Sequence, residues 1–126
     1  MSSGLLRVMA RRTDPRAVRA AWWASRALSH ARRALVRGEF DGVSLSRPPE
    51  LPAGAGYAVE AVLRRRSASC LERSLVLQRW HAAHGRPLDV VIGVKAPASD
   101  FAAHAWLEGE PPPRNMTFGE LMRLSP

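Results

Sequence analysis

The hydrophobic pattern of this chain changes from helical to extended shortly after Gly85. Before that residue, apolar side chains recur at steps of three and four, most clearly in 13–38, as in amphipathic helices. After it, PLDVVIGV is continuous and rich in β-branched residues, and FAAHAWLE alternates, so both segments predict strands. Helices that precede strands indicate an α+β fold, with N-terminal helices followed by a short antiparallel sheet.

The segment 13–38 predicts one long helix with defined ends. Asp14 suits the N-cap, Pro15 the first turn and Gly38 the C-terminus. One apolar face of this helix is expected to be buried. It comprises Val18, Ala21, Trp22, Ser25, Leu28, Ala31 and Leu35.

The net charge of +8 is carried almost entirely by arginine, because Lys95 is the only lysine. Such a charge fits a nucleic-acid partner, an acidic protein partner or the codon usage of a GC-rich genome. Arg19, Arg26 and Arg33 recur every seven residues on a second face of the long helix. This stripe predicts either a solvated surface or a docking face for an acidic partner.

Three further elements accompany the predicted long helix and strands. The segment 44–56 is rich in Pro and Gly and predicts a loop. Helices are predicted at 57–66 and 69–85. The sequence TFGELMRL begins with a Thr-x-x-Glu capping box, which predicts a short closing helix over 117–124.

At 126 residues, the chain is expected to form one domain (1–126) that buries its own core. We divide it into a loose basic arm at 1–12, a helix and loop at 13–50, and a catalytic core at 51–126. No apolar run is long enough to span a membrane, and the N-terminus lacks the apolar stretch of a secretory signal. A single cysteine excludes an internal disulfide, and together these features favour the cytoplasm.

The single cysteine, Cys70, falls at the predicted start of a helix. Ser69 and Glu72 form a Ser-x-x-Glu capping box before an apolar run, so Cys70 is the expected first helical residue. Free backbone N–H groups and the helix dipole stabilise a thiolate there, and the thiolate is the nucleophilic form. A buried structural cysteine is the alternative interpretation.

A nucleophilic cysteine needs a base, and the chain offers four histidines. His30 is expected on a helix surface. His81 and His84 lie about 15–20 Å along the cysteine helix from Cys70 and lack a third ligand for a metal. His104 follows in the alternating strand, an order that suits a Cys-His pair, although a hydrogen-bonded core histidine is the alternative. No metal and no cofactor are expected.

Four short motifs of this chain resemble those of the transglutaminase-like proteases of lasso-peptide biosynthesis. They are a Cys-x-x-Arg-Ser-Leu helix, a Gly-x-Pro turn, an Ile-Gly-Val strand and a His-Ala-Trp strand. Here they comprise Cys70, Arg73, Ser74 and Leu75; Gly85 and Pro87; Ile92, Gly93 and Val94; and His104, Ala105 and Trp106. The resemblance covers residues 55–125, with the motifs in the same order and at fitting separations.

The resemblance implies a small papain-like core and a cysteine protease that removes the leader peptide from a ribosomally made precursor. A separate ATP-dependent lasso cyclase would then join the freed N-terminal amine to an acidic side chain. Many members carry a leader-binding domain ahead of the protease. Residues 1–50 leave no room for one, so the chain resembles the split form, which works with a separate leader-binding protein. Nucleic acid and membranes are not expected partners.

The third catalytic residue departs from the family pattern. The family usually has Asn-Asp about a dozen residues after the histidine, and the resemblance makes that aspartate the third member of a triad. Here the stretch is PPPRNMTF, with Met116 at the expected position, or Asn115 if the loop is one residue shorter. Asparagine can orient an imidazole and methionine cannot, whereas Glu108 and Glu110 are less well placed. The predicted site therefore adds Asn115 to the cysteine and histidine, with a dyad as the alternative.

Two other functions stay open on the sequence alone. The missing aspartate supports a non-catalytic homologue that scaffolds the precursor, with Cys70 structural. Charge alone supports a basic nucleic-acid-binding helical protein, which duplex DNA would retain in a salt-dependent manner.

Overall fold

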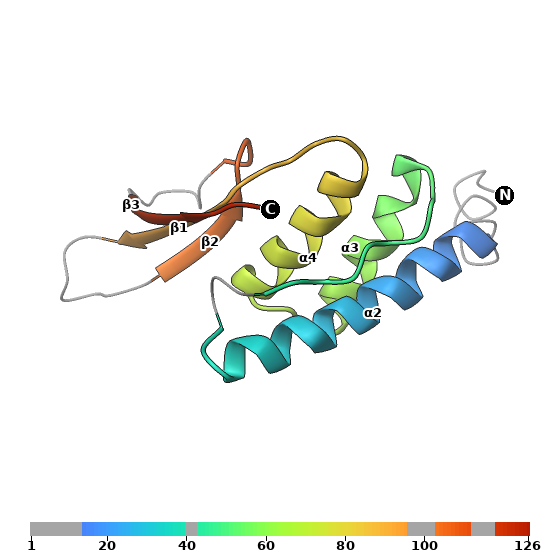
Figure 1. The fold of residues 1–126 in the computed structure, drawn as a ribbon, viewed down its shortest axis with the longest axis horizontal. Helices are drawn as coiled ribbons and strands as arrows, with labels where there is room; N and C mark the ends of the chain where they lie inside the picture. Colours follow the sequence, from blue (N-terminus) through green and yellow to red (C-terminus); the bar gives the residue numbers. More distant parts are fainter. Residues whose placement is uncertain (1–13, 40–42, 96–102, 112–117) are drawn as a thin grey trace, which may run out of the picture.

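The computed structural model describes residues 14–39, 43–95, 103–111 and 118–126. Its helices are α2 (Pro15–Val36), α3 (Gly56–Arg65) and α4 (Cys70–Ala83), with a short 3-10 helix, η1, at Ala53–Ala55. Its strands are β1 (Val90–Lys95), β2 (Ala103–Leu107) and β3 (Phe118–Leu124). Helices precede strands (Figure 1), so the predicted α+β class is confirmed. The arm predicted at 1–12 lies outside the described residues.

The predicted ends of the long helix α2 are confirmed. The carboxylate of Asp14 accepts a hydrogen bond from the amide of Arg16 at 2.9 Å, and Pro15 occupies the first turn. Gly38 follows the last turn with a φ of +77°, a backbone conformation that glycine adopts without the steric cost of a Cβ atom.

The buried face of α2 differs from the predicted one. Val18 and Trp22, predicted to be buried, are 56% and 68% exposed. The buried face is an alanine stripe with two larger residues: Ala17, Ala20, Trp23, Ala24, Ala27, Leu28, Ala31 and Ala34. Its steps of three and four fit the helical repeat as well as the predicted set does, so only the packing against α3 and α4 decides between them. Alanine side chains let these helices approach closely.

The described strands form a three-stranded antiparallel sheet in the order β2-β1-β3. Val90 of β1 pairs with Leu107 of β2 on one side and with Leu124 of β3 on the other. The prediction of a capped helix over 117–124 is therefore wrong, because Phe118–Leu124 is a strand. Pairing with β1 satisfies backbone N–H and C=O groups of both strands, and the helix propensity of so short a segment is too weak to compete.

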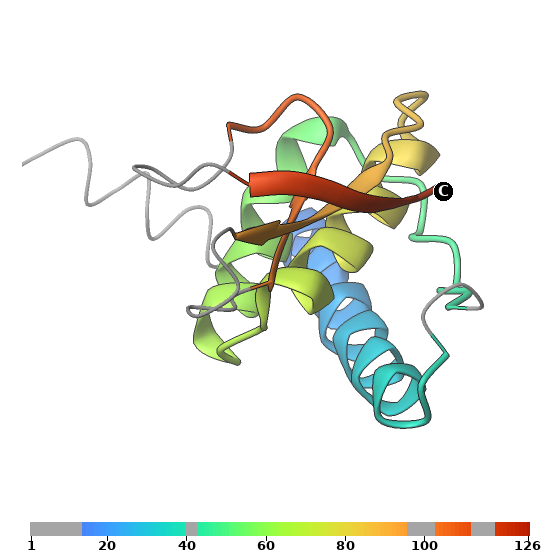
Figure 2. The same ribbon diagram turned by 90° about the vertical axis from the view of Figure 1, so that its left-hand side faces the viewer.

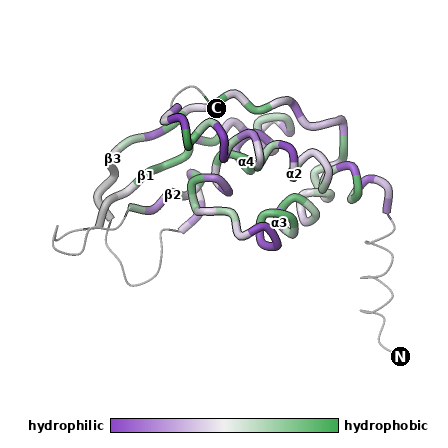
Figure 3. Tube along the Cα trace, turned by 90° about the horizontal axis from the view of Figure 1, so that it is seen from below, coloured by the Kyte–Doolittle hydropathy of each residue, from purple (hydrophilic) through white to green (hydrophobic). Residues whose placement is uncertain are grey.

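The three helices lie together on one side of the sheet (Figures 1 and 2). Helix α2 packs against α3 and α4, and among the described helices α4 is the one that packs closely against β2. Side chains from all these layers join in the core, including Leu28, Val59, Val76 and Val90. Strand β1 lies in the middle of the sheet (Figure 3), and both Val90 and Val91 are buried. Among the described helices, none has the length and hydropathy needed to cross a bilayer.

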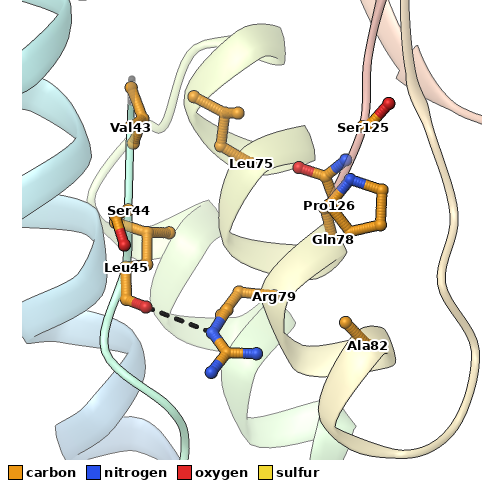
Figure 4. A pocket seen from close by; sticks show the side chains of 9 residues that line it. All are labelled: Val43, Ser44, Leu45, Leu75, Gln78, Arg79, Ala82, Ser125 and Pro126. Carbon is orange, nitrogen blue, oxygen red and sulfur yellow. Dashed lines mark hydrogen bonds between the residues drawn. The ribbon is translucent and has the colours of Figure 1, made fainter. Parts of the chain in front are cut away.

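The predicted loop packs along α2 and the C-terminal half of α4. The indole N–H of Trp23 donates to the carbonyl of Ser46 at 3.0 Å, and Arg79 Nε donates to the carbonyl of Leu45 at 3.1 Å. Leu45 and Leu51 are buried. Figure 4 shows the cavity beside this loop, between α4 and the last two residues of the chain, with the Arg79 bond drawn. Its lining contains neither the cysteine nor the histidine of the candidate site.

Candidate active site

Cys70 is the first residue of α4, as predicted from the capping box. The Glu72 amide donates to Ser69 Oγ at 3.1 Å, and the Ser69 amide donates to Glu72 Oε1 at 2.8 Å. Both reciprocal bonds of the box are therefore formed. Cys70 is a free, exposed cysteine, so the alternative of a buried structural cysteine is wrong. The free N–H groups of the first helical turn surround its position.

Two arginines hold the turn that leads into Cys70. Arg32 of α2 donates through Nε to both carboxylate oxygens of Glu72 at 3.2 Å, and a second guanidinium nitrogen donates to the carbonyl of Arg66. Arg66 in turn donates to the carbonyl of Ser25 at 2.7 Å and to Ser29 Oγ at 3.0 Å. We name these contacts the arginine clamp, because they tie α2 to both ends of the turn.

The turn inside the clamp is strained. Ser67 has a φ of +51°, in the left-handed region that residues with a Cβ atom rarely adopt. The amide of Ala68 donates to the carbonyl of Leu63 at 2.9 Å, so the chain folds back on the end of α3 before α4 begins. Strain of this kind persists only when surrounding contacts hold it, and the clamp supplies such contacts.

Strand β2, which carries the candidate histidine, adjoins the start of α4. The amide of Ala105 donates to the sulfur of Cys70 at 3.4 Å, so the edge of β2 meets the start of α4. His104 directly precedes Ala105, is partly buried, and pairs with Gly93 of β1. The two elements that carry Cys70 and His104, distant in sequence, therefore adjoin in the fold.

Arg73 links three elements one turn after the cysteine. Its guanidinium pairs with Glu60 of α3 at 3.2 Å and with Glu110, beyond β2, at 3.1 Å. Glu110 also accepts a hydrogen bond from the amide of Leu107 at 3.0 Å. The hydrogen bond that Arg73 donates to the Glu110 carboxylate is the main cause that raises the pKa of Arg73 above its ordinary value. This network was not predicted from the sequence, although the arginine of the Cys-x-x-Arg motif was an available signal.

Two further polar side chains of α4 fix the helix against the rest of the molecule. Ser74 is fully buried, and its hydroxyl donates to the carbonyl of Cys70 at 2.7 Å. Gln78 donates through Nε2 to the carbonyls of Leu88 and Leu124 at 2.9 and 2.8 Å. Helix α4 is thereby tied to the segments that enter β1 and leave β3, which limits how far it can shift relative to the sheet.

Most of the sequence matches the model of a known protein family. The model described as the transglutaminase-like superfamily matches residues 5–117. The chain belongs to the transglutaminase-like superfamily. No curated protein and no solved structure matches it. In the described residues, three α-helices and a three-stranded antiparallel sheet agree with a small transglutaminase-like core.

His81 and His84 of this transglutaminase-like domain lie away from its cysteine. Both are at the far end of α4, and the eleven helical steps from Cys70 to His81 span about 16 Å. The ring nitrogens of His84 lie 2.7 and 2.8 Å from the carbonyl oxygens of Trp80 and Leu51, so His84 joins the helix end to the loop. In the described ranges, no group of three or more His, Cys, Asp or Glu side chains could hold a metal ion.

Of the four candidates for the third catalytic position, the structure describes two, Glu108 and Glu110. Asn115 and Met116 lie outside the described residues. Glu108 pairs with Arg123 at 3.3 Å, and Glu110 pairs with Arg73. Both carboxylates therefore have partners other than the histidine, and Asn115 stays the predicted third residue.

Proposed function

We propose that this transglutaminase-like domain is a cysteine peptidase that removes the leader peptide from a lasso-peptide precursor. The observation that carries the proposal is the exposed Cys70 at the capped start of α4, which adjoins the strand of His104. The ordered motifs of the sequence support the lasso-peptide substrate. The superfamily supports cysteine-peptidase chemistry as a class.

In the proposed reaction, His104 takes the thiol proton of Cys70, and the sulfur attacks the carbonyl carbon of the scissile peptide bond. The electron pair of the carbonyl moves to its oxygen, which N–H groups at the start of α4 stabilise. When that pair returns, the C–N bond breaks, and His104 gives the proton to the leaving amine. Water, deprotonated by the same histidine, then hydrolyses the thioester and restores the thiol.

The proposed partners follow from the same motifs. A separate leader-binding protein presents the precursor, and an ATP-dependent cyclase closes the ring after cleavage. Cleavage supplies that cyclase with the free N-terminal amine, so the peptidase must act first.

Replacing Cys70 with alanine is the decisive test. We expect Cys70→Ala to lower precursor cleavage at least about 10³-fold, because the nucleophile is lost. Since Cys70 is exposed, the thermal unfolding temperature should stay close to that of the wild type. Mass spectrometry of precursor incubated with the variant and the leader-binding protein gives the cleavage rate.

His104→Ala should also slow cleavage strongly, and His30→Ala on the exposed surface of α2 is its matched control. Unchanged cleavage by Cys70→Ala would falsify the peptidase proposal. A wild-type chain that binds the precursor without cleaving it, in the presence of the leader-binding protein, would support the scaffold function instead.

A further inference from the structure

An apolar groove with a basic border lies on the first half of α2. Its apolar lining comes from Val18, Trp22 and Trp23 of the helix and from Pro49 of the loop, and Arg19 and Arg26 lie beside them. The hydrogen bond from Trp23 to the carbonyl of Ser46 holds the loop along the helix. The groove therefore has two fixed walls, one from α2 and one from the loop.

Trp22 is the feature of this groove that needs an explanation. It is 68% exposed and Val18 is 56% exposed, although burial would stabilise both side chains. Large, exposed tryptophan side chains beside arginines are typical of the centres of protein interfaces, where they supply much of the binding energy. A bound partner that covered Trp22 would bury this apolar surface and gain the corresponding stabilisation.

The charges around the groove define the occupant. Helix α2 contains no acidic residue, and in the part of the chain that the structure describes Arg19 and Arg26 form no ion pair. Residues 1–13 contain three arginines and no acidic residue, so their charge does not complement Arg19 and Arg26. A second copy of this chain, with a net charge of +8, is opposed in the same way.

We propose that this groove binds an acidic segment of a partner protein, which places an apolar side chain against Trp22 and carboxylates beside Arg19 and Arg26. The first turns of α2 lie at the end of the molecule away from the sheet (Figure 1), so a bound partner leaves Cys70 open. The exposed apolar part, Val18 and Trp22, is too small to anchor the chain on a lipid surface by itself. A groove lined mainly by apolar side chains also fits phosphates poorly.

The probe for this site is a fluorescein-labelled model helix of about 15 residues with leucines on one face and glutamates beside them. One control peptide replaces the glutamates with lysines, and the other replaces the leucines with alanines. We expect the acidic, leucine-bearing peptide to bind the full chain with a Kd in the micromolar range and the two controls to bind at least about tenfold more weakly.

Variants of the chain test the residues of the groove. Trp22→Ala and the double variant Arg19→Glu, Arg26→Glu should each weaken binding about tenfold or more. The double variant Arg64→Glu, Arg65→Glu changes the net charge equally on exposed residues of α3 and should bind like the wild type. Cys70→Ala should also bind normally, which separates this site from the peptidase function. Circular dichroism confirms the fold of each variant.

Several outcomes would overturn the proposal. The first is the absence of saturable binding by the wild type up to about 1 mM peptide. The second is binding by Trp22→Ala as tight as that of the wild type. The third is a loss of affinity in the α3 double variant equal to that in the Arg19→Glu, Arg26→Glu variant. Binding to phosphatidylserine vesicles that Trp22→Ala abolishes would assign the groove to a membrane surface. Self-association in sedimentation that Trp22→Ala abolishes would assign it to a second copy of the chain.

Discussion

Cys70 has a chemical environment made by a few near neighbours. Its own carbonyl accepts the hydroxyl of Ser74, and its sulfur accepts the amide of Ala105. A capping box one residue earlier fixes where the helix starts. The side chain nevertheless stays exposed, so a peptide carbonyl has room to reach the sulfur. At this scale the domain combines a fixed backbone with an accessible nucleophile, as covalent catalysis requires.

Asn115 is the residue whose role we predict from the pattern of the resembled family and from the chemistry of its amide. A histidine base works only if its second nitrogen is held, and an amide oxygen can accept that N–H whereas a thioether cannot. We expect Asn115→Ala to lower turnover by roughly one to three orders of magnitude. Met116→Asp, which restores the residue usual in the family, should be tolerated. The cleavage rate with saturating leader-binding protein measures both; wild-type turnover by Asn115→Ala would instead indicate a Cys-His dyad.

Glu110 should make stability depend on acid pH. Burial raises the pKa of its carboxyl, but hydrogen bonds from Arg73 and from the Leu107 amide, with the Arg73 charge, leave the net pKa below its ordinary 4.5. A carboxyl whose pKa is lower in the folded state than in the unfolded state stabilises the fold. This stabilisation is fully present above the pKa of the unfolded state and is lost as the pH falls through the pKa of the folded state. Glu110→Gln should therefore cost about 0.5–1.5 kcal/mol at neutral pH and less near pH 3.

Urea unfolding of Glu110→Gln at both pH values tests this expectation. Glu39→Gln is the matched control, because Glu39 forms an exposed pair with Arg37. Parallel stability curves for Glu110→Gln and the wild type across the acid range would contradict the role of the Arg73 pair.

The arginine clamp shows how one element positions another. Helix α2 contributes no candidate catalytic residue, yet Arg32 and the hydroxyl of Ser29 hold both ends of the strained turn before Cys70. Arg73 performs the same task between α4, α3 and the residues after β2. The helices therefore fix the start of α4 relative to the edge of β2.

Removing one arm of the clamp should destabilise the domain. Arg66→Ala loses the hydrogen bonds to the Ser25 carbonyl and the Ser29 hydroxyl, so the free energy of unfolding should fall by about 1–3 kcal/mol. The neighbouring Arg65 is exposed, so Arg65→Ala should change the free energy of unfolding by less than about 0.5 kcal/mol. Urea denaturation of both variants makes the comparison, and equal effects would show that the clamp contributes nothing.

Across the whole molecule, two surfaces of different chemistry lie on different elements. The candidate active site lies where α4 meets β2, whereas the groove beside Trp22 lies on the first half of α2. The chain has a net charge of +8, and this charge attracts acidic partners toward both surfaces from a distance. A single core that contains side chains of α2, α3, α4 and the sheet connects the two surfaces.

The activity of the chain should depend on a separate leader-binding protein. We expect slow precursor cleavage by the purified chain and an increase of about tenfold or more when that protein is added, because it raises the local concentration of precursor. A time course of cleavage by mass spectrometry, with and without the protein, gives the ratio. Full activity of the chain by itself would refute this dependence.

The sequence by itself determined the features that depend on near neighbours along the chain. Asp14 and Ser69 cap their helices through hydrogen bonds that span only two or three residues, so the starts of α2 and α4 could be predicted. The β-branched run of β1 was likewise visible, and with it the α+β class. Placing Cys70 at the start of a helix needed no knowledge of the rest of the fold.

Only the tertiary structure decided which surfaces meet. The three-and-four spacing of α2 allows two apolar faces, and packing against α3 and α4 buries the alanines and leaves Trp22 exposed. The segment ending at Leu124 carries a helix-start signal, yet pairing with β1 makes it a strand. Likewise, Arg73 meets Glu110 only after β2 has paired with β1. Such contacts join residues far apart in sequence, so a local sequence pattern cannot predict them.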